Sequence, residues 1–454
     1  MSGGDAASAS RRGFLRGAAG LAAAAGAALA GDAGTRAFAK ADGESAPPPA
    51  SDIEPFWGRN QSGIVTPAQA HTYFAALDLT TTRRGDVIAL LKAWTNAAAR
   101  LTSGKPIERF ERTELAYDYD TTTTTTVTTA SEPTPTTVSL PDTGEADGLA
   151  PARLTLTFGF GAGLFEKDGT DRYGLAKHRP AAFVDLPHFA GDELAADRTG
   201  GDLSIQGCAD DPQVAFHAVR QLVRLADEVA QVRWAQTGFL PNFASGQTPR
   251  NLMGFRDGTV NPSTRDPVTM DQFVWVGDEG PGWMRGGSYL VVRRIRIALE
   301  HWDRSKIELQ EQTIGRHKIS GAPLGKNSEH EPLDLAAAGN DGNPVIGENA
   351  HVRLAAAASN GGAQILRRPY SYNDGVNFTA ERWPPWRQGM EYDAGLFFIC
   401  YQRDPRTGFV KIFENMAKLD MLNQFVTHVG GGLFACPGGV AEGQFIGQPL
   451  FETA

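Results

Sequence analysis

The sequence predicts an α+β fold made of two βαββαβ units, each an antiparallel sheet with helices on one side. Three observations support this prediction. Each half contains a short apolar strand followed by a helix that an Asp-Pro pair opens, at Asp211-Pro212 and at Asp404-Pro405. An earlier strand in each half also precedes a helix. Phe216 and Phe409 occupy the same offset from their Asp-Pro pairs, which indicates a duplication.

The first unit is expected to begin with a strand from His71 to Leu79, followed by a helix that Asp86 caps and that ends at Leu101. Alternating apolar residues from Leu154 to Phe160 predict a second strand. A third strand, from Leu203 to Gly207, leads into the Asp211-Pro212 helix. The apolar positions of that helix share one face, and they are Ala215, Val219, Leu222, Val223 and Ala226.

The second unit is expected to repeat this pattern. A strand from Tyr289 to Leu299 precedes a helix from Asp303 to Ile314, and a strand from Leu396 to Tyr401 precedes the second Asp-Pro helix. We place one unit at residues 40–275 and the other at residues 276–454. Two such sheets placed face to face would enclose a pocket.

The N-terminus carries an export pattern. The stretch Ser10-Arg11-Arg12-Gly13-Phe14-Leu15-Arg16 is a twin-arginine motif, and an alanine- and glycine-rich run follows from Gly17 to Ala30. That run is too short and too weakly apolar to span a bilayer. We therefore expect residues 1–39 to be a Tat signal peptide, the Tat machinery to be a partner, and the mature protein to be periplasmic or extracellular.

Composition narrows the function classes. The formal net charge of -9, with both signs interspersed, argues against a nucleic-acid partner. Cys208, Cys400 and Cys436 form no CxxC motif and are expected to be buried packing residues. The stretch from Thr121 to Thr137 is expected to be a solvated insertion in the first unit. Composition leaves open whether the chain forms a homo-oligomer.

Familiar catalytic motifs are missing from the sequence. Gly159-Phe160-Gly161-Ala162-Gly163 follows a strand, but Leu164 stands where a dinucleotide fingerprint has its third glycine. The sequence contains no GxSxG elbow of a serine hydrolase and no HExxH zinc motif. These patterns argue against a nucleotide, hydrolase or zinc function.

One acid stands out in the stretch NLMGFRDGTVNP, at residues 251–262. Gly254 and Gly258 allow unusual backbone angles, and Asn261-Pro262 closes the segment as a turn, so the Asp257 carboxylate can be aimed. Either the turn itself or some chemistry requires this carboxylate. Further along, His317, His330 and His351 are each candidates for an axial metal ligand. His351 to Leu354 alternates in the manner of a strand.

Several segments occur together in a characteristic order and spacing: Gly254-Phe255-Arg256-Asp257-Gly258 with its GxxDG pattern, Gly315-Arg316, Asn349 to Arg353, Leu366 to Tyr372, and Asp393 to Phe398. In these segments the chain resembles the dye-decolorizing (DyP-type) haem peroxidases, in particular the Tat-exported deferrochelatase/peroxidase branch associated with iron uptake. The resemblance covers the chain from about Ala50 to its end. It implies two ferredoxin-like units with antiparallel sheets that enclose a haem pocket, and one haem b per chain.

The resemblance also implies roles for individual residues. His351 is similar to the proximal iron ligand, and Asp257 and Arg367 to the distal pair. Asp257 would carry a proton between the peroxide oxygens, and Arg367 would stabilise charge during O–O heterolysis. Arg316 is similar to a propionate partner, and the positions similar to haem-lining residues are Gly258, Thr259, Val260 and Phe398.

Two features concern the surroundings of the haem. We expect Asp393 to accept a hydrogen bond from the second ring nitrogen of His351. The all-alanine run from Ala355 to Ala358 departs from relatives, which often have polar residues there.

The expected function is peroxide-dependent oxidation of bulky one-electron donors such as dyes, phenols or porphyrins. The aromatic residues weighed as electron relays are Trp302, Trp383, Trp386 and Tyr401, for each of which plain packing is the simpler interpretation. One alternative is a factor that handles haem or iron with iron-uptake components as partners, with incidental peroxidase activity. Another is a binding module without haem on the same scaffold.

Overall fold

The computed structural model describes residues 52–107, 110–114, 136–140, 142–241, 247–380 and 388–452. The expected signal peptide lies outside these residues, and so does the threonine-rich stretch up to residue 135. Residues 51–454 belong to one compact unit. Across the described ranges, no helix has both the length and the apolar character needed to cross a membrane.

Nine strands form one antiparallel sheet in the order β7-β11-β4-β5-β1-β6-β9-β10-β8, and β7 also pairs with β10. The extra pairing closes the sheet into a ring. The strands are β1 (His71–Leu79), β4 (Thr155–Phe160), β5 (Leu203–Ala209), β6 (Ala230–Phe239), β7 (Ser288–Ile297), β8 (Leu366–Arg367), β9 (Tyr370–Ala380), β10 (Gln388–Gln402) and β11 (Val426–Cys436). A separate hairpin joins β2 (Phe110–Glu114) to β3 (Thr136–Leu140).

The two halves of the ring repeat one strand order. In the first half β1 lies between β6 and β5, with β4 beyond β5, and in the second half β7 lies between β11 and β10, with β9 beyond β10. The halves meet through the pairs Ala435–Phe160 and Phe239–Ser371. The duplication inferred from the Asp-Pro pairs therefore has a counterpart in strand order.

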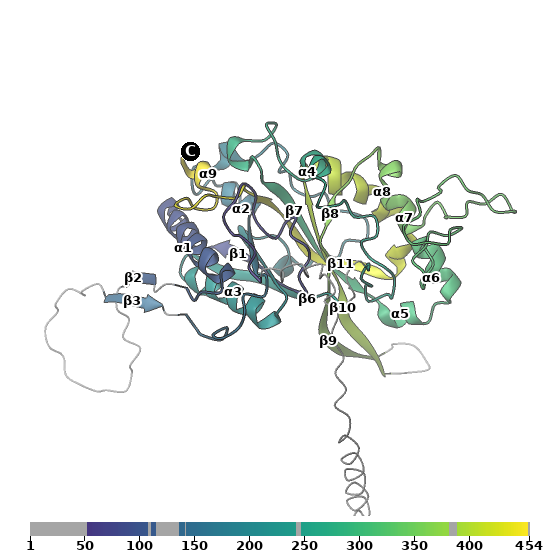
Figure 1. Ribbon diagram of the computed structural model, residues 1–454, viewed down its shortest axis with the longest axis horizontal. Coiled ribbons are helices and arrows are strands. Elements are labelled where there is room, and N and C mark those ends of the chain that lie inside the picture. The colour runs from purple at the N-terminus through teal and green to yellow at the C-terminus, as the bar shows by residue number, and fades with distance from the viewer. Residues whose placement is uncertain are drawn as a thin grey trace, which may run out of the picture. The chain divides into compact units, whose positions relative to one another are not determined.

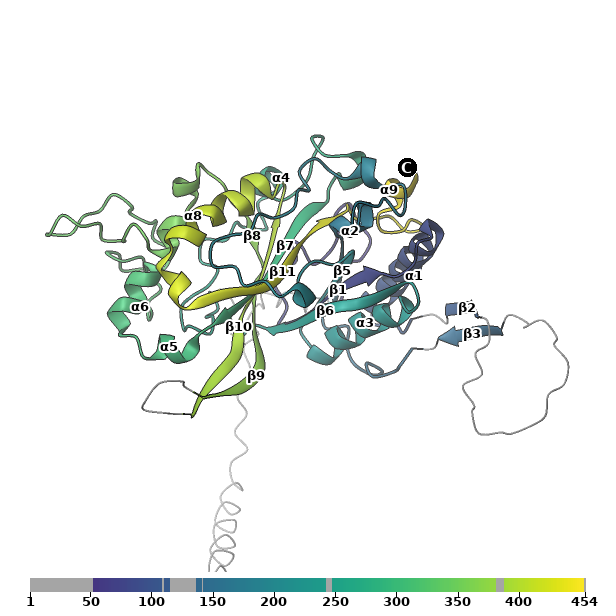
Figure 2. The same cartoon turned by 180° about the vertical axis from the view of Figure 1, so that it is seen from behind.

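Helices pack beside each half of the sheet. Figures 1 and 2 show α1 (Arg84–Thr102) and α3 (Pro212–Leu225) beside β1 and β5, whereas the later helices lie beside β7, β10 and β11. These later helices are α5 (Leu299–Asp303), α6 (Ile307–Ile314), α7 (His351–Ala355) and α8 (Lys411–Leu419), and a π-helical turn at Arg406–Val410 precedes α8. The remaining short helices are α2 (Ala162–Phe165), α4 (Pro267–Phe273) and α9 (Gln448–Glu452).

Capping residues and other short sequence patterns predicted where most of the expected helices lie. Asp211 caps α3, because its carboxylate accepts from the backbone N–H groups of Gln213 (2.7 Å) and Val214 (3.1 Å). Asp86 is not a cap. It lies in the first turn of α1, where its carboxylate pairs with the Arg83 side chain. The helix expected from Asp303 to Ile314 begins later, at Ile307, because Lys306 has an extended backbone and is the N-cap of α6. Asp303 instead ends the separate short helix α5.

The expected strand at His351 is wrong. His351–Ala355 is the short helix α7, which begins where the Ala350 carbonyl accepts from the N–H groups of Arg353 (3.0 Å) and Leu354 (3.1 Å). Over four residues an alternating pattern and a helical pattern are hard to tell apart, and the alanines that follow favour a helix.

Across the described residues, buried side chains occupy the space where a pocket between the sheets was expected. The space inside the ring is filled by a cluster of buried side chains that includes Phe74, Trp234, Phe397 and Phe434. The ring of Phe74 on β1 lies 5.5 Å from that of Phe397 on β10, so the two halves pack directly against each other. A cavity lies on the outer face of the second half, between the sheet and the helices α7 and α8.

Candidate active site

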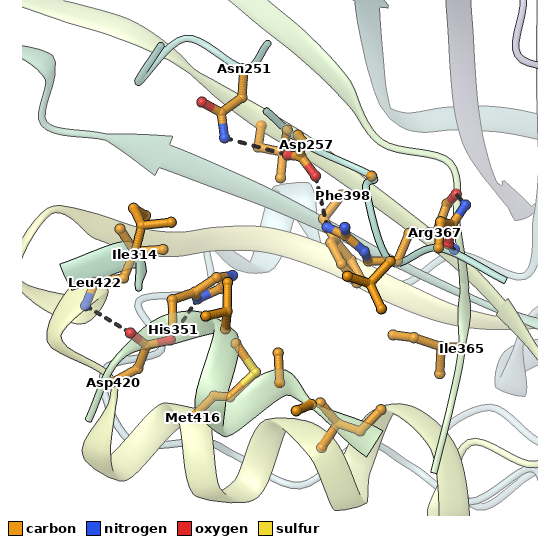
Figure 3. A pocket seen from close by; sticks show the side chains of 18 of the residues that line it. Asn251, Asp257, Ile314, His351, Ile365, Arg367, Phe398, Met416, Asp420 and Leu422 are labelled. Atoms are coloured by element: carbon orange, nitrogen blue, oxygen red, sulfur yellow. Dashed lines mark hydrogen bonds and ion pairs between the residues drawn. The ribbon is translucent and has the colours of Figure 1, made fainter. Parts of the chain in front are cut away.

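The cavity has a volume of about 320 Å³. Its floor comes from β7, β10 and β11, its lower wall from α7 and α8, and its upper wall from the turn at residues 251–262 (Figure 3). Apolar side chains supply much of the surface, among them Ile295, Ile297, Phe398, Ile412, Phe413 and Met416. A second, more polar cavity of about 520 Å³ adjoins it and shares Asp257, Asn261 and Arg367.

Asp257 and Arg367 meet in the upper wall (Figure 3). Arg367 Nη1 donates to Asp257 Oδ1 at 2.9 Å, and the Asn251 amide reaches the other carboxylate oxygen at 3.4 Å. The Asp257 side chain is 14% exposed. The Asp257 N–H stabilises the turn by donating to the Pro249 carbonyl. The next residue, Gly258, has a φ of +112°, a backbone angle that glycine adopts more readily than other residues. The carboxylate is therefore held in one place at the cavity surface.

Asn261 fixes the position of Arg367. Its side-chain oxygen accepts from the Arg367 N–H at 2.8 Å, and its side-chain nitrogen donates to the Arg367 carbonyl at 2.8 Å. The turn that begins with Asp257 thus ends in a residue that binds β8 through two hydrogen bonds. The backbone of Arg367 is fixed relative to the Asp257 carboxylate as a result.

His351 lies at the first position of α7, in the lower wall (Figure 3). Its Nδ1 lies 2.7 Å from Asp420 Oδ2, and the other oxygen of that carboxylate accepts from the Leu422 N–H at 2.8 Å. Burial lowers the pKa of His351, but the charge and hydrogen bond of Asp420 raise it more, so the pKa is raised overall. With Nδ1 engaged, Nε2 is the nitrogen left for a metal.

The expectation that Asp393 is the partner of His351 is wrong. The Asp393 carboxylate accepts a hydrogen bond from Arg294 at 2.7 Å. Arg294 is buried and also pairs with Asp374. The residue that sequence reasoning missed is Asp420, which caps the 3-10 turn Met421–Gln424. Its only sequence signal is an aspartate just before a short apolar stretch, which is common at helix starts.

The other two candidate histidines do not line the cavity. His317 pairs with Glu311 at 2.9 Å, and its side chain is 41% exposed. His330 is exposed. A histidine that sequence reasoning did not consider, His428 on β11, does line the cavity. Burial and the charge of Arg293 lower the pKa of His428 to about 3, so its imidazole is neutral at ordinary pH.

The remaining expected site residues gather at this cavity. Gly258, Thr259, Val260 and Phe398 all line it, and Val260 is 70% exposed at the surface. Arg316 also lines it and is buried, and its Nη1 donates to the carbonyls of Gly321 (2.7 Å) and Glu329 (2.9 Å). Desolvation by burial lowers the pKa of Arg316.

The aromatic residues weighed as relays have separate surroundings. Trp302 is buried behind the cavity wall, with its ring 5.9 Å from that of Phe255 and its indole N–H on the Met253 carbonyl. Tyr401 lies inside the ring of strands and donates to Gln206 at 2.8 Å. Trp383 and Trp386 lie outside the described residues.

Comparison with known proteins identifies the family. Residues 61–240 match the family model described as Dyp-type peroxidase, N-terminal, and residues 248–441 match the one described as Dyp-type peroxidase, C-terminal. The chain belongs to the Dyp-type peroxidase family. Together the two matched regions cover most of the residues that the structure describes.

Relatives of the Dyp-type family extend over nearly the whole chain. A dye-decolorizing peroxidase of Thermobifida fusca is 38% identical over 407 residues, covering 86% of this chain and 84% of that protein. A deferrochelatase of Escherichia coli is 32% identical over 424 residues, covering 91% of this chain and 90% of that protein. The solved structure of ferric DtpA from Streptomyces lividans is 39% identical, with a TM-score of 0.75, and the match covers 88% of this chain and 98% of that one.

These relatives establish the general activity. The protein is a haem peroxidase of the Dyp type, with a ferredoxin-like α+β fold, and it uses hydrogen peroxide and a reducing substrate. The family therefore supports an enzyme rather than the alternative of a binding module without haem.

Proposed function

We propose that the cavity between the sheet and the helices α7 and α8 binds one haem b per chain, with His351 as the iron ligand and Asp257 and Arg367 as the residues that act on peroxide. The observation that carries the proposal is the arrangement in Figure 3. The His351–Asp420 pair and the Asp257–Arg367 pair lie on opposite sides of one largely apolar cavity.

The residues present fit a haem. The volume of about 320 Å³ falls within the range of roughly 300–1,000 Å³ that is typical of cofactor sites. His351 offers one imidazole nitrogen, because the other is held by Asp420. Arg316 is a buried cation for which the described residues provide no carboxylate hydrogen bond, so the propionate of a haem is a suitable partner.

When bound, haem supplies the redox-active iron at which peroxide is reduced. The protein's own part is to move a proton and to stabilise charge. The Asp257 carboxylate accepts a proton from one peroxide oxygen and returns it to the other, since both oxygens can come within hydrogen-bond reach of a fixed carboxylate. Arg367 donates hydrogen bonds to the oxygen on which negative charge develops. Asp420 holds the His351 ring in one orientation and one tautomer.

The Asp257→Asn variant tests the central step. The amide keeps the shape of the carboxylate but cannot accept the proton, so we expect haem content to be retained while the rate of the peroxide-induced spectral change falls. Asp266→Asn is the matched control, because the Asp266 carboxylate caps α4 and lines neither cavity. A peroxide reaction at the wild-type rate in Asp257→Asn would reduce this residue to a turn-former.

Iron handling is a second candidate function, and the similarity to the E. coli deferrochelatase favours it. If the protein removes iron from haem, incubation with added haem should yield an iron-free porphyrin ring that is intact by mass. Degraded porphyrin or unchanged haem would contradict this function while leaving the peroxidase assignment in place.

We further infer that residues 1–39 direct export by the Tat pathway, on the basis of Arg11 and Arg12. Replacing both arginines with lysine should retain the protein in the cytoplasm, as fractionation would show. Unchanged export would contradict the assignment.

The repeated strand order supports two ferredoxin-like units, and their division at residue 275 stays a prediction.

A further inference from the structure

Glu329 lies in the long irregular segment between α6 and α7, and its carboxylate contacts both sides of the turn that carries Asp257. Thr259 Oγ1 donates to Glu329 Oε1 at 2.9 Å, and Arg256 Nε forms an ion pair with Glu329 Oε2 at 3.1 Å. Arg256 directly precedes Asp257, and Thr259 follows two residues later. One carboxylate from a distant segment therefore braces this turn at two points.

The backbone of Glu329 connects the same turn to Arg316. The Glu329 carbonyl accepts from Arg316 Nη1 at 2.9 Å, and Arg316 lines the cavity proposed to bind haem. The segment also packs tightly: a Cβ on Gly321, where φ is +75°, would lie 3.1 Å from the Arg256 side chain and 3.2 Å from that of Glu329. Glu329 thus lies between the cavity-lining arginine and the Asp257 turn.

The charge of Glu329 bears on which arginine pairs with Asp257. Burial raises the pKa of Glu329, but hydrogen bonds from Thr248 and Thr259 and the charges of Arg256 and His330 lower it more, so the pKa is lowered overall. The ionised carboxylate neutralises Arg256, whose side chain is 21% exposed. Without that partner, a partly buried cation next to Asp257 would compete with Arg367 for the Asp257 carboxylate.

We propose that Glu329 is a positioning residue that holds the Asp257 turn through Arg256 and Thr259 and keeps Asp257 paired with Arg367. Its consequence for catalysis rests on the role proposed above for Asp257, whereas its effect on the turn does not. The two claims can therefore fail separately.

The first experiment measures hydrogen exchange in the haem-free protein, so that no loaded enzyme is needed. The Asp257 N–H donates to the Pro249 carbonyl and the Asn261 N–H to the Gly258 carbonyl, and both amides report on the turn. In Glu329→Ala we expect these amides to exchange about tenfold faster, since hydrogen bonds to charged groups are among the stronger ones. Glu329→Gln keeps an acceptor for Thr259 and should give a smaller increase.

Glu331→Gln is the matched control. Glu331 lies two residues further along the same segment, and among the described residues its carboxylate accepts from the N–H groups of Asn327 and Ser328. Exchange at the Asp257 turn should equal wild type in this variant. Wild-type exchange in Glu329→Ala would overturn the proposal, and so would an equal increase in Glu331→Gln.

The second experiment asks whether the freed arginine is the cause. In the haem-loaded enzyme, Glu329→Gln should slow the reaction with peroxide and leave KM for the reducing donor unchanged. Adding Arg256→Gln to this variant removes the competing cation and should restore most of the lost rate. A double variant slower than or equal to Glu329→Gln would overturn the pairing argument. If Asp257→Asn reacts normally with peroxide, the role proposed for Asp257 fails, and the exchange data still decide the role of Glu329.

Discussion

Asp257 and Arg367 are 110 residues apart in the chain, and their side chains meet at 2.9 Å in one wall of the cavity that His351 also lines. The contact depends on Asn261, which belongs to the same turn as Asp257 and holds the backbone of Arg367 through two hydrogen bonds. A carboxylate and a guanidinium fixed in this way can act on a small substrate without reorganising, which is the basis of electrostatic catalysis.

Replacing Arg367 with leucine should leave haem content unchanged and slow the reaction with peroxide on the order of a hundredfold, as expected for loss of one donor to a developing anion. Stopped-flow absorption would measure the rate. A rate equal to that of wild type would remove Arg367 from the mechanism.

His351→Ala should abolish most haem binding, because the variant lacks the nitrogen proposed to hold the iron. Haem content per chain, measured after reconstitution, is the readout. His317→Ala is the control, since His317 pairs with Glu311 away from the cavity and its loss should leave haem content unchanged. Full haem content with an unaltered spectrum in His351→Ala would point to another ligand, with His428 the first to examine.

Asp420→Asn should retain haem but raise the reduction potential of the iron, because a neutral amide donates less electron density through His351 than a carboxylate. Activity should fall by about ten- to a hundredfold, the range typical of such partners. In Asp393→Asn the potential should stay at the wild-type value, since Asp393 pairs with Arg294. The opposite result for these two variants would restore Asp393 as the partner of His351.

Glu145 should contribute to the pH dependence of the stability of the fold. Burial raises the pKa of this carboxyl, but hydrogen bonds from Thr143, the backbone, Arg220 and His217 outweigh that effect and lower it from its usual 4.5 to about 2. A lowered pKa in the folded state adds stability above about pH 4.5, and this stability is lost as the pH falls toward 2.

The Glu145→Gln variant tests this dependence. It should be less stable than wild type at pH 7, by about 1 kcal/mol after allowing for solvent screening, and the difference should shrink between pH 4.5 and 2. Thermal unfolding at several pH values would show the trend. Glu442→Gln, at an exposed position, should match wild type throughout, and a difference for Glu145→Gln that stays constant with pH would contradict the assignment.

The sequence by itself determined the features that depend on a few neighbouring residues. Asp211-Pro212 marks the start of α3 because an aspartate that caps a helix and a proline at its first position act locally. The glycines around Asp257 mark a turn for the same reason, since glycine permits a positive φ. The family motifs are also short segments, and the residues singled out from them line the cavity, except Asp393, which pairs with Arg294.

Only the tertiary structure decided the features that depend on contacts between distant segments. The β6, β9 and β11 strands escaped prediction, and β11 contains Gly430, Gly431 and Gly432, which disfavour a strand until neighbouring strands hold it. Asp420 became the partner of His351 across 69 residues, and Glu329 reached the Asp257 turn across about as many. The physical reason is that capping and turn preferences act within a few residues, whereas pairing between distant residues appears only once the whole chain has packed.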